Sequence, residues 1–309
     1  MKKLIAVLTA AVIAGFTAST AEALPTAVFE FKFDETGVGA TNTGSAGTSS
    51  NLITDQWIYD GTANNDLHGA AGSGVTGQST DRALDTSTMV GGVYPGGNDY
   101  CPNFRVNSPN VDNISGLHTA TWSGWFNTSQ AISTSQQIYL MSKGTWNSGF
   151  QIRTGTTADT LEVFLGGVTN YGSVSFDVSS VFEFTDNGIW EFWAVTYDGS
   201  LSSENVKLYW GTNSSSVVQV DDNKTLNCGT LVDTTSNPFG LNMNIGVDYV
   251  AGYSLTGFTD GARIFDSVLT AADLETLRSA DAVPEPGTLL LVGTGVLGAI
   301  GFIRRRRMR

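Results

Sequence analysis

The chain has 309 residues, with 16 Lys and Arg against 29 Asp and Glu, so its formal net charge is −13. This balance argues against nucleic-acid binding, which draws most of its affinity from Lys and Arg placed on phosphates. With 41% apolar, 10% aromatic and only 15% charged residues, the composition predicts a folded, loop-rich, mostly β protein that works outside the cell.

The first 23 residues have the three parts of a secretory signal peptide. Lys2 and Lys3 form a positive n-region, residues 4–16 form an apolar h-region, and Ala21-Glu22-Ala23 is an A-x-A cleavage site. Cleavage after Ala23 is therefore expected. The alternative interpretation is an N-terminal helix of the core.

The body, residues 24–282, contains short runs of aromatic and β-branched residues that alternate in period two between Gly, Asn, Asp and Ser clusters. This pattern is typical of the strands of a sandwich or jelly roll. The expected strands are Ala27–Phe33, Thr119–Phe126, Gln137–Ser142, Gly149–Thr154, Thr160–Leu165, Trp190–Tyr197, Val206–Trp210, Met243–Val247 and Phe258–Phe265.

One helix is expected in the body. Thr270 can cap a turn that starts at Ala271, with Leu274 and Leu277 facing inward. Residues 36–118 include long Gly, Ser, Thr and Asn segments in which few apolar residues recur, so they are interpreted as decoration of one sandwich rather than a second domain.

Five motifs occur in the body in the order and spacing of a known family. They are Phe31-Lys32-Phe33-Asp34-Glu35, Ala120-Thr121-Trp122-Ser123-Gly124-Trp125-Phe126, Met141-Ser142-Lys143-Gly144, Gly188-Ile189-Trp190-Glu191-Phe192-Trp193-Ala194-Val195-Thr196-Tyr197-Asp198-Gly199 and Phe258-Thr259-Asp260-Gly261-Ala262-Arg263-Ile264-Phe265. Together they resemble the concanavalin A-like (LamG/pentraxin-type) jelly roll over roughly residues 27–279. Many members have a Tyr-Val-Asp-Gly hairpin where this chain has residues 208–213, so that turn differs. The resemblance implies an all-β jelly-roll β-sandwich, a fold that hosts lectins, adhesive modules, glycosidases and lyases.

The same resemblance implies a structural Ca²⁺ where the N-terminal strand meets the last strand. Asp34 and Asp260 occupy the matching motifs, and the polar loop after Asp34 can add carbonyl oxygens toward the about six to eight ligands that Ca²⁺ prefers. The alternative is that both aspartates only cap turns.

Cys101 and Cys228 are the only two cysteines. An even number in an exported chain favours a disulfide, and closing so long a loop would contribute about 4 to 5 kcal/mol in the chain-entropy model. Two free thiols too far apart to pair are the alternative.

No catalytic group of residues can be assembled from the sequence. Glucanases of this fold carry three carboxylates alternating along one strand, whereas the nearest approach here, Asp159 and Glu162, has the wrong spacing. His68 and His118 are the only histidines, and neither stands in a metal-ligand pair or beside a nucleophile. The sequence therefore predicts a protein that is not an enzyme.

Aromatic side chains could contact sugars, but strand alternation makes core packing the expected role of most tryptophans. These are Trp122, Trp125, Trp190, Trp193 and Trp210. Aromatic residues in expected loops are better candidates for ligand contact, namely Trp57, Tyr59, Tyr94, Tyr100 and Trp146.

The last part of the chain, residues 283–309, has the pattern of a second targeting segment, after the signal peptide. A Pro-rich motif at 283–286 precedes an uncharged stretch at 287–303 and a basic tail at 304–309. A helix over that stretch spans about 25 Å, the short end of what crosses a bilayer, and the basic tail would stay in the cytoplasm. The body between the two targeting segments has 9 Lys and Arg against 27 Asp and Glu, a net charge of −18.

These three parts resemble the PEP-CTERM sorting signal of Gram-negative bacteria. The residues that carry the resemblance are Pro284, Glu285, Pro286, Arg304, Arg305, Arg306 and Arg307. It implies an exosortase-type enzyme that recognises the tail, cuts near the motif and releases or transfers the protein from an inner-membrane intermediate. The alternative is a permanent C-terminal anchor.

We therefore expect an exported cell-surface or extracellular-matrix protein with a non-catalytic, glycan-binding jelly-roll module. Its expected partners are the sorting enzyme and extracellular polysaccharide or other surface glycans. The alternatives are a structural or protein-adhesive surface protein, or a divergent polysaccharide-active enzyme.

Overall fold

The computed structural model describes residues 23–37, 39–48, 51–55, 67–87, 92–93, 99–100, 103–106, 115–128, 137–145, 148–181, 188–232, 243–245 and 255–283. Ala21, with most of the predicted signal peptide, and the tail from Pro284 onward lie outside these ranges. In the described ranges no helix is long and apolar enough to cross a membrane.

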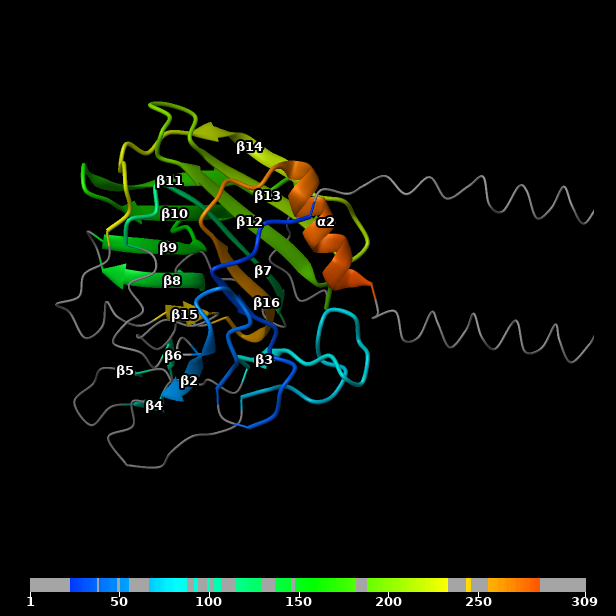
Figure 1. Cartoon of the computed structure of the whole chain (residues 1–309). Helices are drawn as coiled ribbons and strands as arrows, with labels where there is room; N and C mark the ends of the chain where they lie inside the picture. The colour runs from blue at the N-terminus through cyan, green and yellow to red at the C-terminus, as the bar shows by residue number, and fades with distance from the viewer. Residues whose placement is uncertain are drawn as a thin grey trace, which may run out of the picture.

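The larger sheet contains β1 (Phe29–Phe31), β3 (Leu84–Asp85), β7 (Thr119–Thr128), β12 (Glu191–Asp198), β13 (Val206–Thr212), β14 (Val218–Lys224) and β16 (Gly257–Phe265). Its strand order is β1-β16-β7-β12-β13-β14, with β3 pairing to β16 (Figure 1). All of these pairs are antiparallel, and Phe29 of β1 lies opposite Ile264 of β16. The first and last strands of the body are therefore neighbours, as the family resemblance implied.

The smaller sheet contains β8 (Tyr139–Thr145), β9 (Ser148–Thr154), β10 (Thr160–Gly166), β11 (Tyr171–Asp177) and β15 (Met243–Ile245). Its order is β11-β10-β9-β8-β15, again antiparallel throughout. Two short ribbons are not hydrogen-bonded to either sheet: β2 (Leu52–Asp55) with β6 (Asn103–Val106), and β4 (Gly92–Val93) with β5 (Asp99–Tyr100).

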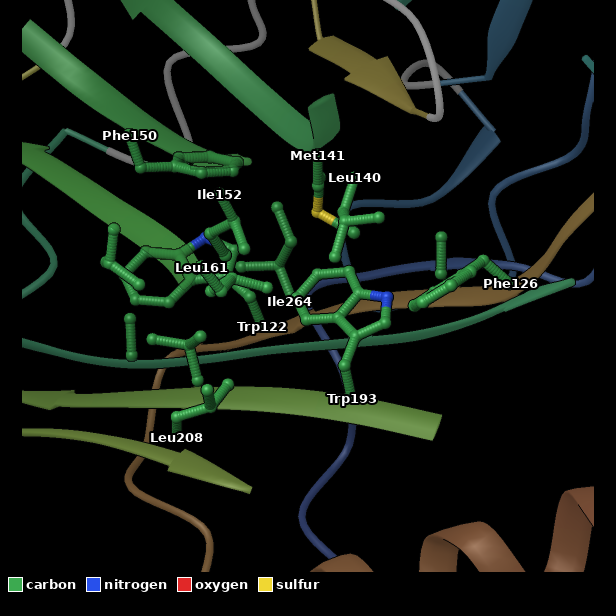
Figure 2. Close-up of a cluster of buried hydrophobic side chains, with 14 of the residues drawn as sticks. Trp122, Phe126, Leu140, Met141, Phe150, Ile152, Leu161, Trp193, Leu208 and Ile264 are labelled. Atoms are coloured by element: carbon green, nitrogen blue, oxygen red, sulfur yellow. The ribbon is translucent and has the colours of Figure 1, made fainter. Parts of the chain in front are cut away.

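The main core lies between the two sheets (Figure 2). Trp122 of the larger sheet packs on Phe150 of the smaller sheet with ring centroids 5.1 Å apart. Trp193 projects into the same cluster from β12, beside Leu140 and Met141 (Figure 2). The five tryptophans expected in strands are all buried, so their predicted core role is confirmed.

A second apolar cluster covers the outer face of the larger sheet. It joins Trp125 and Phe192 of the sheet to Leu274 and Leu277 of α2 (Ala271–Ala282). Figure 1 shows α2 along this face, with the 67–87 segment, in cyan, beside its C-terminal end. The predicted cap is confirmed, because the Thr270 side chain accepts a hydrogen bond from the Asp273 N–H. Because this second cluster packs α2 against the larger sheet, the C-terminal end of α2 lies next to β1 and β16.

Candidate functional site

A cavity of about 520 Å³ lies where the end of β1, the 67–87 segment, β16 and the end of α2 meet. Its walls carry four carboxylates and two cations, and we call it the acidic cavity. The charged residues are Asp34, Asp81, Asp260, Asp281, Lys32 and Arg263.

Asp34 reaches the cavity because the chain turns sharply just after β1. Phe33 is fully buried and has φ 57°, a backbone conformation that bulky residues rarely adopt and that costs about 1 to 2 kcal/mol. This turn ends the predicted strand two residues early, at Phe31, and lets the Asp34 carboxylate accept the Arg82 N–H at 3.1 Å. The strain at Phe33 thus brings Asp34 to the 67–87 segment.

Asp81 organises the 67–87 segment around its own carboxylate. The N–H and the hydroxyl of Thr76 donate to Asp81 Oδ2 at 2.6 and 2.5 Å. Gly74 must be a glycine here, because a Cβ at that position would lie 2.1 Å from Asp81 Oδ1. The turn leaves Gln78 and Thr80 exposed in the cavity wall.

Asp260 enters the cavity from a bulge in β16. The register of β16 against β7 shifts between Asp260 and Arg263, and Gly261 has φ 53°. Bulges with a left-handed glycine are a common means of re-aiming a neighbouring side chain. The Asp260 carboxylate is buried and accepts the N–H groups of Gly261 at 2.6 Å and Val75 at 3.2 Å.

Asp281 ties the end of α2 to the sheet. Its carboxylate accepts both terminal nitrogens of Arg263, at 2.7 and 2.8 Å, and the indole N–H of Trp125 at 2.9 Å. Arg263 also donates its Nε to Glu30 at 2.9 Å, and its side chain is only 5% exposed. We call Glu30, Trp125, Arg263 and Asp281 the C-terminal clamp.

Burial and crowding perturb the acids of the cavity. Burial raises the pKa of Asp260 well above its ordinary range, and the nearby Asp81 raises it further. Burial also raises the pKa of Asp34, against the hydrogen bond from Arg82, with Asp81 again adding to the rise. For Arg263, burial disfavours the charge, but the ion pairs with Asp281 and Glu30 outweigh it and raise the pKa.

This arrangement offers hydrogen-bond acceptors and donors side by side. The exposed Lys32 ammonium, Gln78 amide and Thr80 hydroxyl can donate, and the Asp34 and Asp81 carboxylates can accept. Such a mixture fits a ligand with several hydroxyl groups, each of which both donates and accepts.

The structure brings the two predicted calcium ligands, Asp34 and Asp260, into one cavity. Within the described part of the chain, however, no three Asp, Glu, His or Cys side chains come close enough together to hold an ion. Both Asp260 oxygens already accept backbone N–H groups. The calcium ion therefore stays a prediction.

Other residues singled out from the sequence lie away from the cavity. Glu162 forms an ion pair with Arg153 at 2.8 Å on the smaller sheet. His68 Nδ1 lies 3.2 Å from the Gly37 carbonyl oxygen, and the exposed His118 is 3.2 Å from the Thr230 hydroxyl. None of these three side chains lines the acidic cavity.

The predicted disulfide is not tested by the structure. Cys101 lies outside the described residues, as do Trp57, Tyr59, Tyr94 and Trp146, and the side chain of Tyr100 is not described either. The thiol of Cys228 is buried, its sulfur lies 3.4 Å from the Leu165 carbonyl oxygen, and burial raises its pKa to about 11. The bridge stays a prediction.

Sequence reasoning missed Asp81, Asp281, Lys32 and Trp125 as parts of the site. Asp81 stands in a stretch without periodicity, and Asp281 stands at a helix end, where an acidic residue is unfavourable to the helix dipole. That unfavourable charge at the end of the expected helix is a sequence signal that could have drawn attention to Asp281.

Comparison with protein families decides the nature of the C-terminal end. Residues 282–307 match the family described as the PEP-CTERM protein-sorting motif. The chain carries a PEP-CTERM sorting signal. This motif marks an exported protein of the cell envelope that is processed by an exosortase. No curated protein matches the chain.

The solved structures similar to this chain include three proteins of low sequence identity. The binding domain of Paraclostridial mosquitocidal protein 1 is 12% identical with a TM-score of 0.51, over 82% of this chain and 52% of that one. The botulinum neurotoxin serotype G binding domain is 13% identical with a TM-score of 0.47, over 82% and 50%. The Ruminococcus gnavus IT-sialidase CBM40 bound to α2,3-sialyllactose is 13% identical with a TM-score of 0.39, over 57% and 92%.

The likeness to the mosquitocidal protein domain shows a shared all-β jelly-roll sandwich fold. This chain spans about half the length of the first two binding domains. The PEP-CTERM signal therefore follows a body with an all-β sandwich fold.

Proposed function

We propose that this PEP-CTERM protein is a non-catalytic, glycan-binding module of the cell surface or extracellular matrix of a Gram-negative bacterium. The LamG-type assignment of its jelly roll and the inner-membrane intermediate are parts of the same proposal. The glycan site is the acidic cavity, and its ligand class is a neutral, polyhydroxylated saccharide such as an exopolysaccharide of the producing cell.

The observation that carries the proposal is the chemistry of the cavity walls. About 520 Å³ lies within the range of small-molecule pockets, which is about 300 to 1,000 Å³. Carboxylate oxygens of Asp34 and Asp81 can each accept from sugar hydroxyls, while Lys32 and Gln78 can donate to them. A charge-assisted hydrogen bond to a hydroxyl group contributes about 1.5 to 3 kcal/mol, so a few such bonds suffice for specific binding.

Binding without hydrolysis is favoured because the carboxylates hold the walls together. Asp81 fixes the 67–87 segment through Thr76, and Asp281 pairs with Arg263. Asp260 is buried on backbone N–H groups, so it is poorly placed to transfer protons with a substrate. A glycosidase needs two carboxyl groups that are free to face the glycosidic bond, whereas Asp34 is the only exposed one of the four in the acidic cavity.

The test is a glycan screen with a chain that starts at Leu24 and ends at Val283, including polysaccharide from the producing cell. Lys32→Ala and Gln78→Ala each remove one exposed donor from the cavity, and each should weaken binding about 5- to 50-fold. Gln219→Ala is the matched control, because Gln219 is exposed on β14 and bonds only Asn223 among the described contacts.

Three outcomes would count against the proposal. Retention of no glycan would favour a structural or protein-adhesive role. Equal binding by the cavity variants and the control would move the site elsewhere. Release of shortened products from the polysaccharide, abolished by Asp34→Asn, would show an enzyme instead.

A further inference from the structure

The matched sorting segment begins next to the C-terminal clamp. The match starts at residue 282, which is also the last residue of α2. The C-cap, Val283, is 52% exposed and lines the acidic cavity, and Pro284 follows it directly. Only Ala282 and Val283 separate the anchored Asp281 from the Pro-Glu-Pro sequence.

The end of α2 is held firmly up to Asp281. The C-terminal clamp supplies three hydrogen bonds to the Asp281 carboxylate, two of them from the buried Arg263. Earlier in the helix, Arg278 donates to the Thr212 carbonyl oxygen at 2.7 Å, and Glu275 accepts the Val217 N–H at 2.8 Å. Side-chain hydrogen bonds to the body therefore hold α2 in place up to Asp281.

A sorting enzyme that cuts near the motif has to take residues on both sides of the cut into its active site. Helical, hydrogen-bonded backbone resists cleavage, and cleavage of such a segment follows the population of its opened state. The residues that precede the motif are in α2 and in the cavity wall. The clamp contacts hold these residues on the body through Asp281.

We propose that the C-terminal clamp regulates sorting, because it must open before the exosortase can process the folded protein. An intact clamp lowers the rate of processing. Breaking a contact to Asp281, or adding a flexible spacer between Val283 and Pro284, raises that rate. This proposal concerns processing alone and does not depend on glycan binding.

The experiment follows conversion of the full-length chain to its mature form by pulse-chase in cells that contain the sorting enzyme. Asp281→Asn removes the charge that pairs with Arg263, and it should speed conversion about three- to tenfold. A spacer of eight Gly and Ser residues inserted between Val283 and Pro284 should speed it at least as much. The spacer leaves every clamp contact in place, so it isolates the effect of distance from that of stability.

Glu275→Gln is the matched control for Asp281→Asn. It weakens an ion pair with Arg278 on the same helix but leaves the clamp intact, so conversion should proceed at the wild-type rate. Hydrogen exchange at the amides of residues 279–283 should accelerate in Asp281→Asn and not in Glu275→Gln.

Conversion of the spacer variant at the wild-type rate would overturn the proposal, since it would mean that sorting ignores the folded body or precedes folding. If Asp281→Asn prevents folding, the spacer variant alone decides the question. Faster conversion in Glu275→Gln than in Asp281→Asn would also contradict it, because general loosening of α2 would then be the cause.

Discussion

Glu191 is a buried acid outside the acidic cavity. It is the first residue of β12, it is 4% exposed, and its Oε2 accepts the Trp210 indole N–H at 2.7 Å. Burial raises its pKa from 4.5 to about 7, against the opposing effect of the Trp210 hydrogen bond. The folded protein therefore holds this proton more tightly than the unfolded chain, and the contribution of Glu191 to stability falls as the pH rises from about 4.5 to about 7.

Glu191→Gln should remove this pH dependence. The amide oxygen keeps the bond from Trp210, and the side chain stays neutral at every pH. Relative to the wild type, the variant should gain stability between pH 4.5 and pH 7 and keep that gain above pH 7, by about 3 kcal/mol at most. Urea unfolding of both proteins at several pH values measures the difference. A difference that stays constant from pH 4 to pH 8 would show that Glu191 is not perturbed.

The predicted calcium ion is tested at Asp34 and Asp260. An ion that binds only the folded state raises the melting temperature with its concentration. Calcium should raise it more than magnesium does, and Asp34→Asn or Asp260→Asn should abolish that excess. Equal shifts of the melting temperature with the two ions would rule out a calcium-specific site at Asp34 and Asp260.

Helix α2 depends on its first turn. Thr270 and Asp273 form a capping box in which the Asp273 carboxylate accepts the Thr270 N–H at 2.9 Å, and the Thr270 hydroxyl accepts the Asp273 N–H at 3.2 Å. Thr270→Ala should therefore lower the free energy of unfolding by about 1 kcal/mol.

Thr276→Ala is the control within the same helix. The Thr276 hydroxyl is exposed and donates only to the Ala272 carbonyl oxygen, a bond that contributes little in mid-helix. Its substitution should change the free energy of unfolding by less than about 0.5 kcal/mol. An equal loss in both variants would mean that the capping box is not formed.

Strands with a buried face could be predicted from the sequence, and exposed ones could not. The aromatic alternation of Trp190–Tyr197 predicted β12 to within one residue at each end. In contrast, β11 and β14 were missed, because Tyr171–Asp177 and Val218–Lys224 lie at sheet edges and carry mostly polar, exposed residues. Their pairing comes from neighbouring strands rather than from their own composition.

The candidate site was predictable only where it belongs to a strand motif. Asp34 and Asp260 follow from the family resemblance, because β1 and β16 are paired in the sheet. Asp81 and Asp281 come from an irregular segment and from a helix end, and they reach the cavity only through tertiary contacts such as those with Thr76 and Arg263. No local pattern encodes such a meeting.

The molecule as a whole consists of an acidic body between two basic ends. Seven of its 16 Lys and Arg lie in the two targeting segments at the ends of the chain, which leaves the body with a net charge of −18. Such a charge keeps an exported protein dispersed. The match to the PEP-CTERM signal starts at Ala282, which is also the last residue of α2, so no spacer separates the signal from the body in the sequence.

The most direct measurement is a structure of the body, from Leu24 to Val283, with an oligosaccharide that the glycan screen retains. We predict that the sugar lies in the acidic cavity, with hydroxyl groups within hydrogen-bond distance of Lys32, Asp34 and Gln78. A sugar bound elsewhere on the body, with none in the cavity, would contradict the proposed function.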